Sequence, residues 1–393
     1  MEVDNKVKYT AFLKDVLVCS LGAYGGPEAH YGVFTNQMVD KKKYLTEAEL
    51  AELIALTALL PGPSSSQTIV SIGYKQGGPL LAFLTMLVWA MPVLIVMTIL
   101  SFSDLILTAI NLSIEGLRYI GPMAMGFIVV ALVRLGSKVL VNKAGTVLFV
   151  LAAITSYFFR FVWVFPLLLI LGGLMTVFLS KESQLWHKVK VKPQWTYITV
   201  FAILALGSFL AAQFYGGMIL TLFEQFYRYG YLVIGGGQVL VPYMYNGLVE
   251  VAGYITHENF VTGYGLVQGL PGPMFSFSAY AGGIAAQNQG VFIQVLSAMV
   301  SGIAIFLPGL LLIYFIYPMW EQLKMIKGLK VALSGVIAVA CGLIFSTAII
   351  LIQSTDWSLV GLIVTVLTVV SLLSKKLPAP IIVALVLMIG FIL

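Results

Sequence analysis

The chain has 393 residues, of which 60% are hydrophobic and only 10% are charged, and its formal net charge is +6. A soluble domain carries about 25% charged residues, so this composition excludes a water-soluble globular protein. The positive charge does not indicate a nucleic-acid partner, because in a membrane protein the position of charges matters more than their sum. We expect the lipid bilayer to be the main environment of the chain.

Long apolar runs predict membrane-spanning helices. Residues 79–103, 161–180, 291–320 and 331–355 contain no charged side chain, and about 20 apolar residues cross a bilayer as a helix. Only helices and closed barrels satisfy the backbone in lipid, and these runs are too uniformly apolar for barrel strands. We therefore predict an all-α polytopic membrane protein.

In chain order, a Gly-Gly-Pro break at 25–27 is followed by two short apolar pieces, 46–60 and 64–74, which flank a Pro-Gly-Pro motif. A second Pro-Gly-Pro lies at 271–273, beyond a further Gly-Gly pair at 235–236. Each motif predicts a broken helix, because proline cannot continue one. Helices are predicted at 79–103, 119–137, 144–159, 161–180, 195–215, 291–317, 331–353, 357–374 and 377–393.

The sequence repeats itself at a shift of 210 residues. Gly25-Gly26 aligns with Gly235-Gly236, Pro61-Gly62-Pro63 aligns with Pro271-Gly272-Pro273, and Ser66 aligns with Ser276. Further identities pair Asn36 with Asn246, Tyr44 with Tyr254, Thr46 with Thr256 and Gly73 with Gly283. We predict two homologous transporter repeats, 1–180 and 216–393, joined by a basic cytoplasmic linker at 181–194 and a connecting helix at 195–215.

Charged loops predict that the two repeats have opposite orientations. Lys41, Lys42 and Lys43 lie in a loop whose counterpart, 249–257, contains no Lys or Arg. Basic loops stay cytoplasmic, so equivalent loops with opposite charge bias lie on opposite sides. This pattern is typical of inverted-topology repeats in transporters. It predicts a multi-pass protein of the plasma (inner) membrane with a cytoplasmic N-terminus and an external C-terminus.

Each Pro-Gly-Pro is predicted to be the tip of a re-entrant hairpin, because the flanking pieces are too short to span. The first N–H groups of the helix after such a break lack partners and carry about half a positive charge. Such helix starts bind anions, and they predict a substrate site between the two tips; the alternative is a simple kink whose serines cap the backbone. The predicted site comprises Pro61, Gly62, Pro63, Ser64, Ser65, Ser66, Gln67, Pro271, Gly272, Pro273 and Ser276.

The Gly-Gly-Pro segment contains a second group of candidate functional residues. Pro27 opens a helix with Glu28 in its first turn and His30 two residues later. Ionisable groups inside a membrane are costly and mark functional sites, so Glu28 and His30 are candidates for proton coupling or gating. The alternative is that Glu28 only complements the helix dipole and that Lys75 is an interfacial residue. The candidate coupling or gating set is Gly25, Gly26, Pro27, Glu28, His30, Lys75, Gly235 and Gly236.

No enzymatic motif is present in the sequence. A P-loop, G-x-S-x-G, H-E-x-x-H and a cysteine pair are all missing, and the pattern pairs no His or Lys with the serines of the first tip. We expect no enzyme, no metal site and no cofactor. Glu224 and Arg228 lie four residues apart and predict an intrahelical ion pair.

Three motifs together resemble the chromate ion transporter family in its long, two-domain form. They are "GAYGGPEAHYGVF", "LTALLPGPSSSQTIVSIGYKQGG" and "GLVQGLPGPMFSFSAYAGG". The resemblance covers both repeats. One departure is Met274-Phe275 at the second tip, where the first tip has serines. The resemblance implies a functional core that includes Gly25, Gly26, Pro27, Pro61, Gly62, Pro63, Ser64, Gln67, Pro271, Gly272 and Pro273.

The resemblance also implies export of chromate from the cytoplasm, with sulfate as a structural analogue. We expect a secondary-active carrier that works by alternating access. Two alternatives stay open: a carrier or channel for another anion such as sulfate, molybdate or a carboxylate, and a membrane enzyme or scaffold. The coupling ion and the oligomeric state, including a homodimer, are left open by the sequence.

Overall fold

The computed structural model describes residues 8–139, 143–161, 163–180, 185–186, 191–232, 240–324, 326–355 and 357–392. These residues form helices joined by short connections, and no strand occurs among them. The all-α class predicted from the apolar runs is therefore confirmed for the described part of the chain.

The first half begins with short helices around the predicted breaks and continues into longer ones. Its elements are α1 (Tyr9–Gly22), α2 (Pro27–Phe34), the π-helix η1 (Thr35–Lys41), α3 (Glu47–Leu59), α4 (Ser64–Leu100), α5 (Ser103–Ala109), the 3₁₀ helix η2 (Ile114–Leu117), α6 (Ile120–Val139), α7 (Lys143–Phe158) and α8 (Val164–Leu179).

The connecting helix α9 (Trp195–Tyr215) precedes the elements of the second half of the chain. These are α10 (Met218–Leu232), α11 (Leu240–Tyr245), the π-helix η4 (Asn246–Val251), α12 (His257–Gln268), the 3₁₀ helix η5 (Met274–Ser276), α13 (Phe277–Ala285), η6 (Gln287–Gln289), α14 (Val291–Ile316), η7 (Tyr317–Met319), α15 (Trp320–Leu323), α16 (Lys327–Ser354), α17 (Leu359–Ser374) and α18 (Ala379–Ile392).

The predicted helices from 79 onward are found close to their predicted limits. The helix α4 is broken internally at Gly77 and Gly78, where φ is −162° and +71°, so the short piece 64–76 is separate from the longer piece 79–100. Glycine permits this left-handed turn without a steric penalty. The predicted boundary between the piece 64–74 and the helix starting at 79 is thus confirmed.

The pieces on either side of the first Pro-Gly-Pro form a helical hairpin. Thr46 caps α3 in a capping box with Glu49, and Thr256 caps the corresponding helix α12. A helix of 13 residues, the length of α3, is roughly 20 Å long, which is less than the ~30 Å of a bilayer core. Neither arm of this hairpin can cross a bilayer alone.

Among the residues that the structure describes, five helices are long and apolar enough to cross a membrane by length and composition. They are the helical stretches Ser64–Leu100, Ile114–Arg134, Trp195–Tyr215, Val291–Leu323 and Lys327–Ser354. The shorter helices α7, α8, α17 and α18 are also strongly apolar. The chain is therefore a multi-pass membrane protein.

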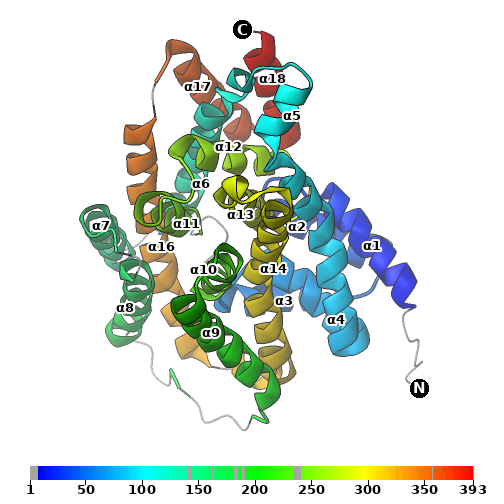
Figure 1. Ribbon diagram of the computed structural model, residues 1–393. Helices are drawn as coiled ribbons and strands as arrows, with labels where there is room; N and C mark the ends of the chain where they lie inside the picture. The colour runs from blue at the N-terminus through cyan, green and yellow to red at the C-terminus, as the bar shows by residue number, and fades with distance from the viewer. Residues whose placement is uncertain are drawn as a thin grey trace.

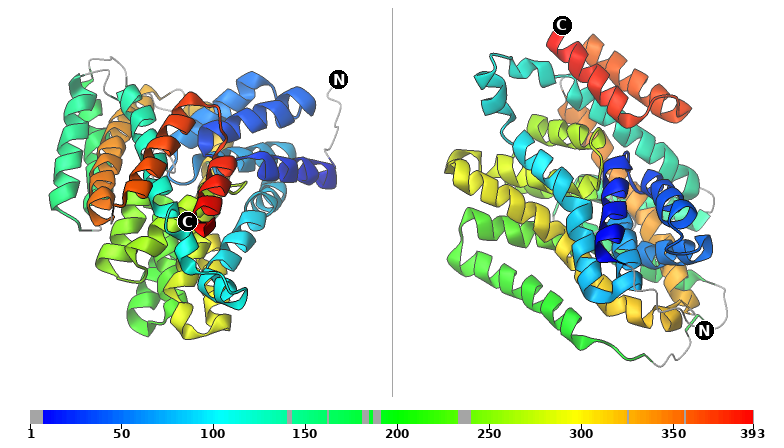
Figure 2. Two further views of the ribbon diagram at one scale, coloured as in Figure 1. Left: turned by 90° about the horizontal axis from the view of Figure 1, so that it is seen from above. Right: turned by 90° about the vertical axis from the view of Figure 1, so that its right-hand side faces the viewer.

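The long helices pack side by side, with α10 and α14 in the interior of the bundle (Figure 1). Helices α7, α8 and α16 lie together at one side, and α1 and α4 lie at the other (Figure 1). The connecting helix α9 runs along the periphery, and only 6% of its most apolar 18-residue stretch is buried. In the right-hand view of Figure 2, α18 (red) lies at the top of the molecule and α9 (green) runs along its lower side.

Candidate functional site

The first Pro-Gly-Pro forms the tip between α3 and α4. Gly62 has φ of +119°, a left-handed conformation that favours glycine. The first intrahelical bond of α4 runs from the Gln67 N–H to the Pro63 carbonyl at 2.9 Å, and no side chain caps this helix start. The N–H groups of Ser64, Ser65 and Ser66 precede that first bond, so they are the donors available at this tip.

The three serines are buried, and two of them contact residues from other segments. Their exposed fractions are 9% for Ser64, 5% for Ser65 and 0% for Ser66. Ser65 Oγ lies 2.9 Å from His30 Nδ1, and Ser66 Oγ accepts a hydrogen bond from Trp89 Nε1 at 2.9 Å. The expectation that no histidine is paired with these serines is therefore wrong, because the tertiary fold brings α2 against the start of α4.

Gln67 holds the first tip against the second half of the chain. Its Nε2 donates to the Pro61 carbonyl at 2.9 Å and to the Gly309 carbonyl on α14 at 3.4 Å. The side chain is fully buried, and its Oε1 has no partner within the described residues. Gln67 thus positions the tip, and it leaves one buried acceptor unused.

The second Pro-Gly-Pro has a similar backbone with fewer hydroxyl groups. Gly272 has φ of +108°, and its N–H donates to the Ala23 carbonyl at 2.7 Å. Ser276 is fully buried, and its hydroxyl has no hydrogen-bond partner among the described residues. Met274 and Phe275 fill the remaining positions, so this tip is less polar than the first.

The two tips pack reciprocally on opposite halves of the chain. A Cβ at Gly62 would lie 3.4 Å from the Gly230 carbonyl oxygen on α10, and a Cβ at Gly272 would lie 3.7 Å from Ser20 Oγ on α1. Gly230 and Ser20 are themselves 210 residues apart, as are the two tips. Each tip therefore contacts the other half of the chain, at positions that are related by the same shift of 210 residues.

The middle of α4 connects the two tips. Trp89 donates to Ser66 at the first tip and accepts a hydrogen bond from Ser20 Oγ at its own carbonyl, at 2.8 Å. One turn later, Val93 Cγ1 lies 2.9 Å from where a Cβ at Gly272 would be. One helical turn rises about 5.4 Å, so both tips contact the same short stretch of α4.

The Gly-Gly-Pro segment lies beside the second tip. Gly25 and Gly26 have φ of +81° and +101°, and α2 begins directly afterwards at Pro27. The Ala23 carbonyl at the start of this segment is the acceptor of the Gly272 N–H. The side chain of Glu28 lies outside the described structure, and so do Gly235 and Gly236, the counterparts in the second half.

The family model of the chromate transporter matches residues 10–178 and 220–391, which is most of the chain and includes both tips. This chain belongs to the chromate transporter family. The family is one of transporters rather than enzymes. Both matched segments of this family member contain a Pro-Gly-Pro tip and the short helices around it.

The similarity between this chromate transporter family member and its curated relatives covers most of its length. A probable chromate transport protein of Synechococcus elongatus is 24% identical over 379 residues, covering 92% of this chain and 90% of the relative. A chromate transport protein of Pseudomonas aeruginosa is 25% identical, covering 89% and 82%. An uncharacterized transporter of Methanocaldococcus jannaschii is 25% identical, covering 100% and 96%. No solved structure matches the chain.

Charged side chains of this family member gather at the base of the first hairpin, away from its tip. Lys75 pairs with Glu49 across the two arms, and Lys324 pairs with Glu52 at 3.2 Å. The hydrogen bond from Lys75 lowers the pKa of the Glu49 carboxyl below its usual range. Lys75 is therefore bound at the mouth of the hairpin and does not reach the serines in this conformation.

A charge pair also lies inside the bundle. Arg228 Nε donates to Glu224 Oε1 at 2.7 Å, and Arg228 Nη2 donates to Glu224 Oε2 at 3.2 Å. The predicted intrahelical pair is confirmed, and it is largely buried, with side-chain exposures of 16% and 11%. Within the described residues, no group of three His, Cys, Asp or Glu side chains has the arrangement of a metal site.

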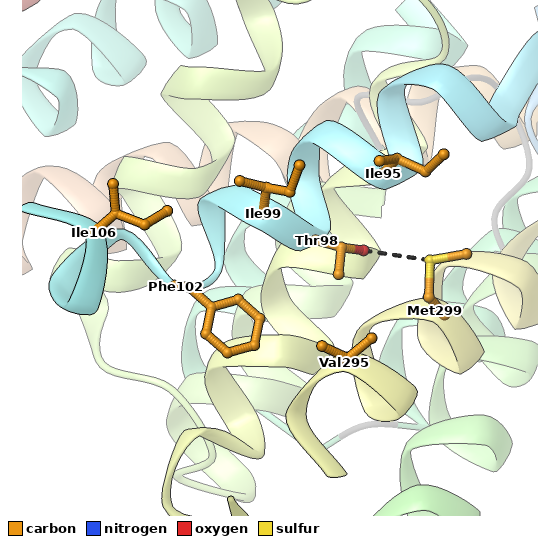
Figure 3. Close-up of a pocket in the computed structure, with 7 residues that line it drawn as sticks. All are labelled: Ile95, Thr98, Ile99, Phe102, Ile106, Val295 and Met299. Atoms are coloured by element: carbon orange, nitrogen blue, oxygen red, sulfur yellow. Dashed lines mark hydrogen bonds between the residues drawn. The ribbon is translucent and has the colours of Figure 1, made fainter. Parts of the chain in front are cut away.

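A pocket of about 430 Å³ lies between α4, α5 and α14, apart from the tips. Figure 3 shows that its labelled side chains are apolar except Thr98, whose hydroxyl faces Met299. Thr98 also donates to the Leu94 carbonyl, so its hydrogen is already used. Ile95 and Ile99 are about half exposed, at 47% and 53%. This lining offers hydrocarbon contacts and no donors for an anion.

Proposed function

We propose that the chain is a secondary-active transporter that exports chromate, a sulfate-like tetrahedral oxyanion, by alternating access. The observation that carries the proposal is the cluster of buried donors at the first tip, inside a chain of the chromate transporter family. Three N–H groups precede the first helical bond of α4, and three serine hydroxyls accompany them. Uncapped helix starts of this kind favour anions.

The second tip supplies the opposite wall of the proposed site. The N–H groups of Met274 and Phe275 precede the bond from the Ser276 N–H to the Pro273 carbonyl. The Ser276 hydroxyl is a buried donor with no hydrogen-bond partner in the described part of the chain, and such groups are costly unless a ligand or water satisfies them. A doubly charged anion that bridges both tips would satisfy it.

The reciprocal packing of the tips supports movement of one repeat against the other. Each tip rests on the other repeat through glycine or serine, so small rigid-body shifts can open one side while the other stays closed. This is how inverted-repeat transporters alternate access around a fixed site. Gly25, Gly26 and Pro27 lie beside the second tip and would act as a hinge or gate, and the Lys75 pair would close the mouth of the first hairpin.

The proposed orientation places the N-terminus in the cytoplasm and the C-terminus outside, in the plasma membrane. Lys75 and Lys324 both pair with the first turns of α3, which supports a single basic face on the cytoplasmic side. The membrane potential, negative inside, then favours anion exit by about 2.3 kcal/mol per charge per 100 mV. Reporter fusions at both termini test this orientation, and signals from the wrong compartments would overturn it.

The decisive experiment measures chromate and sulfate flux in proteoliposomes containing the full chain. A Ser65→Ala/Ser66→Ala double variant removes two hydroxyls at the first tip, and we expect its KM for the anion to rise about ten-fold or more, since each lost hydrogen bond to a charged group is worth roughly 1.5–3 kcal/mol. Ser71→Ala is the matched control, because the Ser71 hydroxyl donates within the same helix to the Gln67 carbonyl. Unchanged transport in a folded double variant would contradict the proposed site.

A further inference from the structure

His30 contacts the first tip through one ring nitrogen only. Its Nδ1 lies 2.9 Å from Ser65 Oγ, and the residue is 1% exposed. The other nitrogen, Nε2, is buried and has no hydrogen-bond partner in the part of the chain that the structure describes. The fold therefore fixes Nδ1 beside the serine. No second partner among the described residues sets which ring nitrogen carries the proton.

None of the described groups around His30 neutralises a charge on it, and the side chain of Glu28 lies outside the described structure. Its ring meets Trp89 edge to face, with centroids 5.4 Å apart. The carboxylate of α1, Asp15, is bonded to Gln37, Tyr44 and Lys42, and Lys75 of α4 is paired with Glu49 at the far end of the hairpin. Asp40 and Lys41 of η1 are exposed. A proton on His30 would thus face the tip without a described counter-charge.

We propose that His30 and Ser65 form a proton-binding site that is coupled to the anion site by reversal of one hydrogen bond. The inference rests on the proposed function of the tip as an anion site. When the ring is neutral and carries its proton on Nε2, the Ser65 hydroxyl donates to Nδ1 and is withheld from the anion. When a proton from the solvent binds Nδ1, the Nδ1–H donates to Ser65 Oγ, and the serine hydrogen turns to the anion.

Proton binding then strengthens the anion site in two ways. It adds a positive charge one side chain away from the tip, and it converts Ser65 from a donor to the histidine into a donor to the substrate. Coupling between two binding sites is reciprocal, so the anion also strengthens proton binding by the same factor. Couplings of this kind are commonly about 5–150-fold, and we expect an anion KM at least about ten-fold lower in the protonated form.

The test measures the KM of sulfate and chromate flux in proteoliposomes, with the membrane potential clamped at zero. Burial lowers the pKa of the His30 imidazole from its ordinary value of 6.5 to about 3, and the bound anion is expected to raise it, so pH is varied between about 4 and 8. The wild-type KM is expected to fall as pH falls. His30→Asn retains an amide that can bond Ser65 but cannot titrate, so its KM is expected to be independent of pH. Ser65→Ala is expected to raise KM and to shrink the pH dependence, because the charge remains while the relay is lost.

His257→Asn is the matched control. His257 is bonded through Nδ1 to Tyr245 and through Nε2 to Thr355, away from the tips, and its replacement is expected to keep the wild-type pH profile. The acid–base equilibrium of chromate is the same for every variant, so differences between variants report on the protein. A His30→Asn protein that retains the wild-type pH dependence, or a wild-type KM that does not change with pH, would overturn the coupling while leaving anion transport intact. Absence of flux in the wild type would instead overturn the proposed function.

Discussion

A methyl group added at Gly272 probes the contact between the second tip and the first half of the chain. Gly272 has φ of +108°, and a Cβ there would lie 2.9 Å from Val93 Cγ1 and 3.3 Å from Val93 Cβ. A left-handed conformation costs a non-glycine residue about 1–2 kcal/mol, and crowding of this degree in a packed core costs about 1–3 kcal/mol. We therefore expect Gly272→Ala to lower the free energy of unfolding by about 2–5 kcal/mol.

Two further variants separate the two contributions. Gly290 also has a positive φ, of +89°, but a Cβ there meets nothing within 4 Å, so Gly290→Ala is expected to lose only the conformational part, about 1–2 kcal/mol. Val93→Ala removes the methyl groups that crowd the tip. In the double variant with Gly272→Ala the losses are expected to be less than additive by about 1–3 kcal/mol.

The assay is thermal unfolding of the purified protein in detergent, repeated at several detergent concentrations. Equal losses for Gly272→Ala and Gly290→Ala, together with strict additivity between Gly272→Ala and Val93→Ala, would refute the close packing of this tip on α4. Transport by the folded Gly272→Ala protein is expected to fall as well, because the Gly272 N–H bond to Ala23 joins the tip to the Gly-Gly-Pro segment.

Three other predictions concern the charges and caps. Arg228→Gln is expected to destabilise the protein by about 3–5 kcal/mol, because it leaves the buried Glu224 carboxylate without its partner. Arg160→Gln, in an ion pair whose arginine is 43% exposed, is expected to cost under about 1 kcal/mol. Both losses are measured by thermal unfolding, and losses of similar size would contradict the difference in burial. Thr46→Ala is expected to cost about 1 kcal/mol through loss of the α3 cap, and an unchanged melting temperature would argue against the capping box. Lys75 lowers the pKa of the Glu49 carboxyl from 4.5, so the contribution of this ion pair to stability is present above pH 4.5 and is lost as pH falls below it. The difference in stability between wild type and Glu49→Gln, at most about 1 kcal/mol for an exposed pair, is therefore expected to vanish in acid. A difference that grows as pH falls would contradict this prediction.

Local sequence determined the helices and the places where they break. The apolar runs that predict α6 to α9, α14 and α16 to α18 are long enough to be recognised without tertiary information, because hydrocarbon length alone sets the requirement for a spanning helix. The breaks at Pro61–Pro63, Gly77–Gly78 and Pro271–Pro273 follow from proline, which removes a backbone donor, and from glycine, which permits positive φ. The Glu224–Arg228 pair follows from the four-residue spacing on one helix face.

Only the tertiary structure decided which side chains meet at the tips. His30 and Ser65 are 35 residues apart, Ser66 and Trp89 are 23 apart, and Gln67 and Gly309 are 242 apart. No local spacing encodes such contacts, because they depend on how α2, α4 and α14 pack against one another in three dimensions. The sequence by itself therefore identified the serine tip as a candidate anion site, and the packing of helices far apart in the chain supplied the histidine beside it.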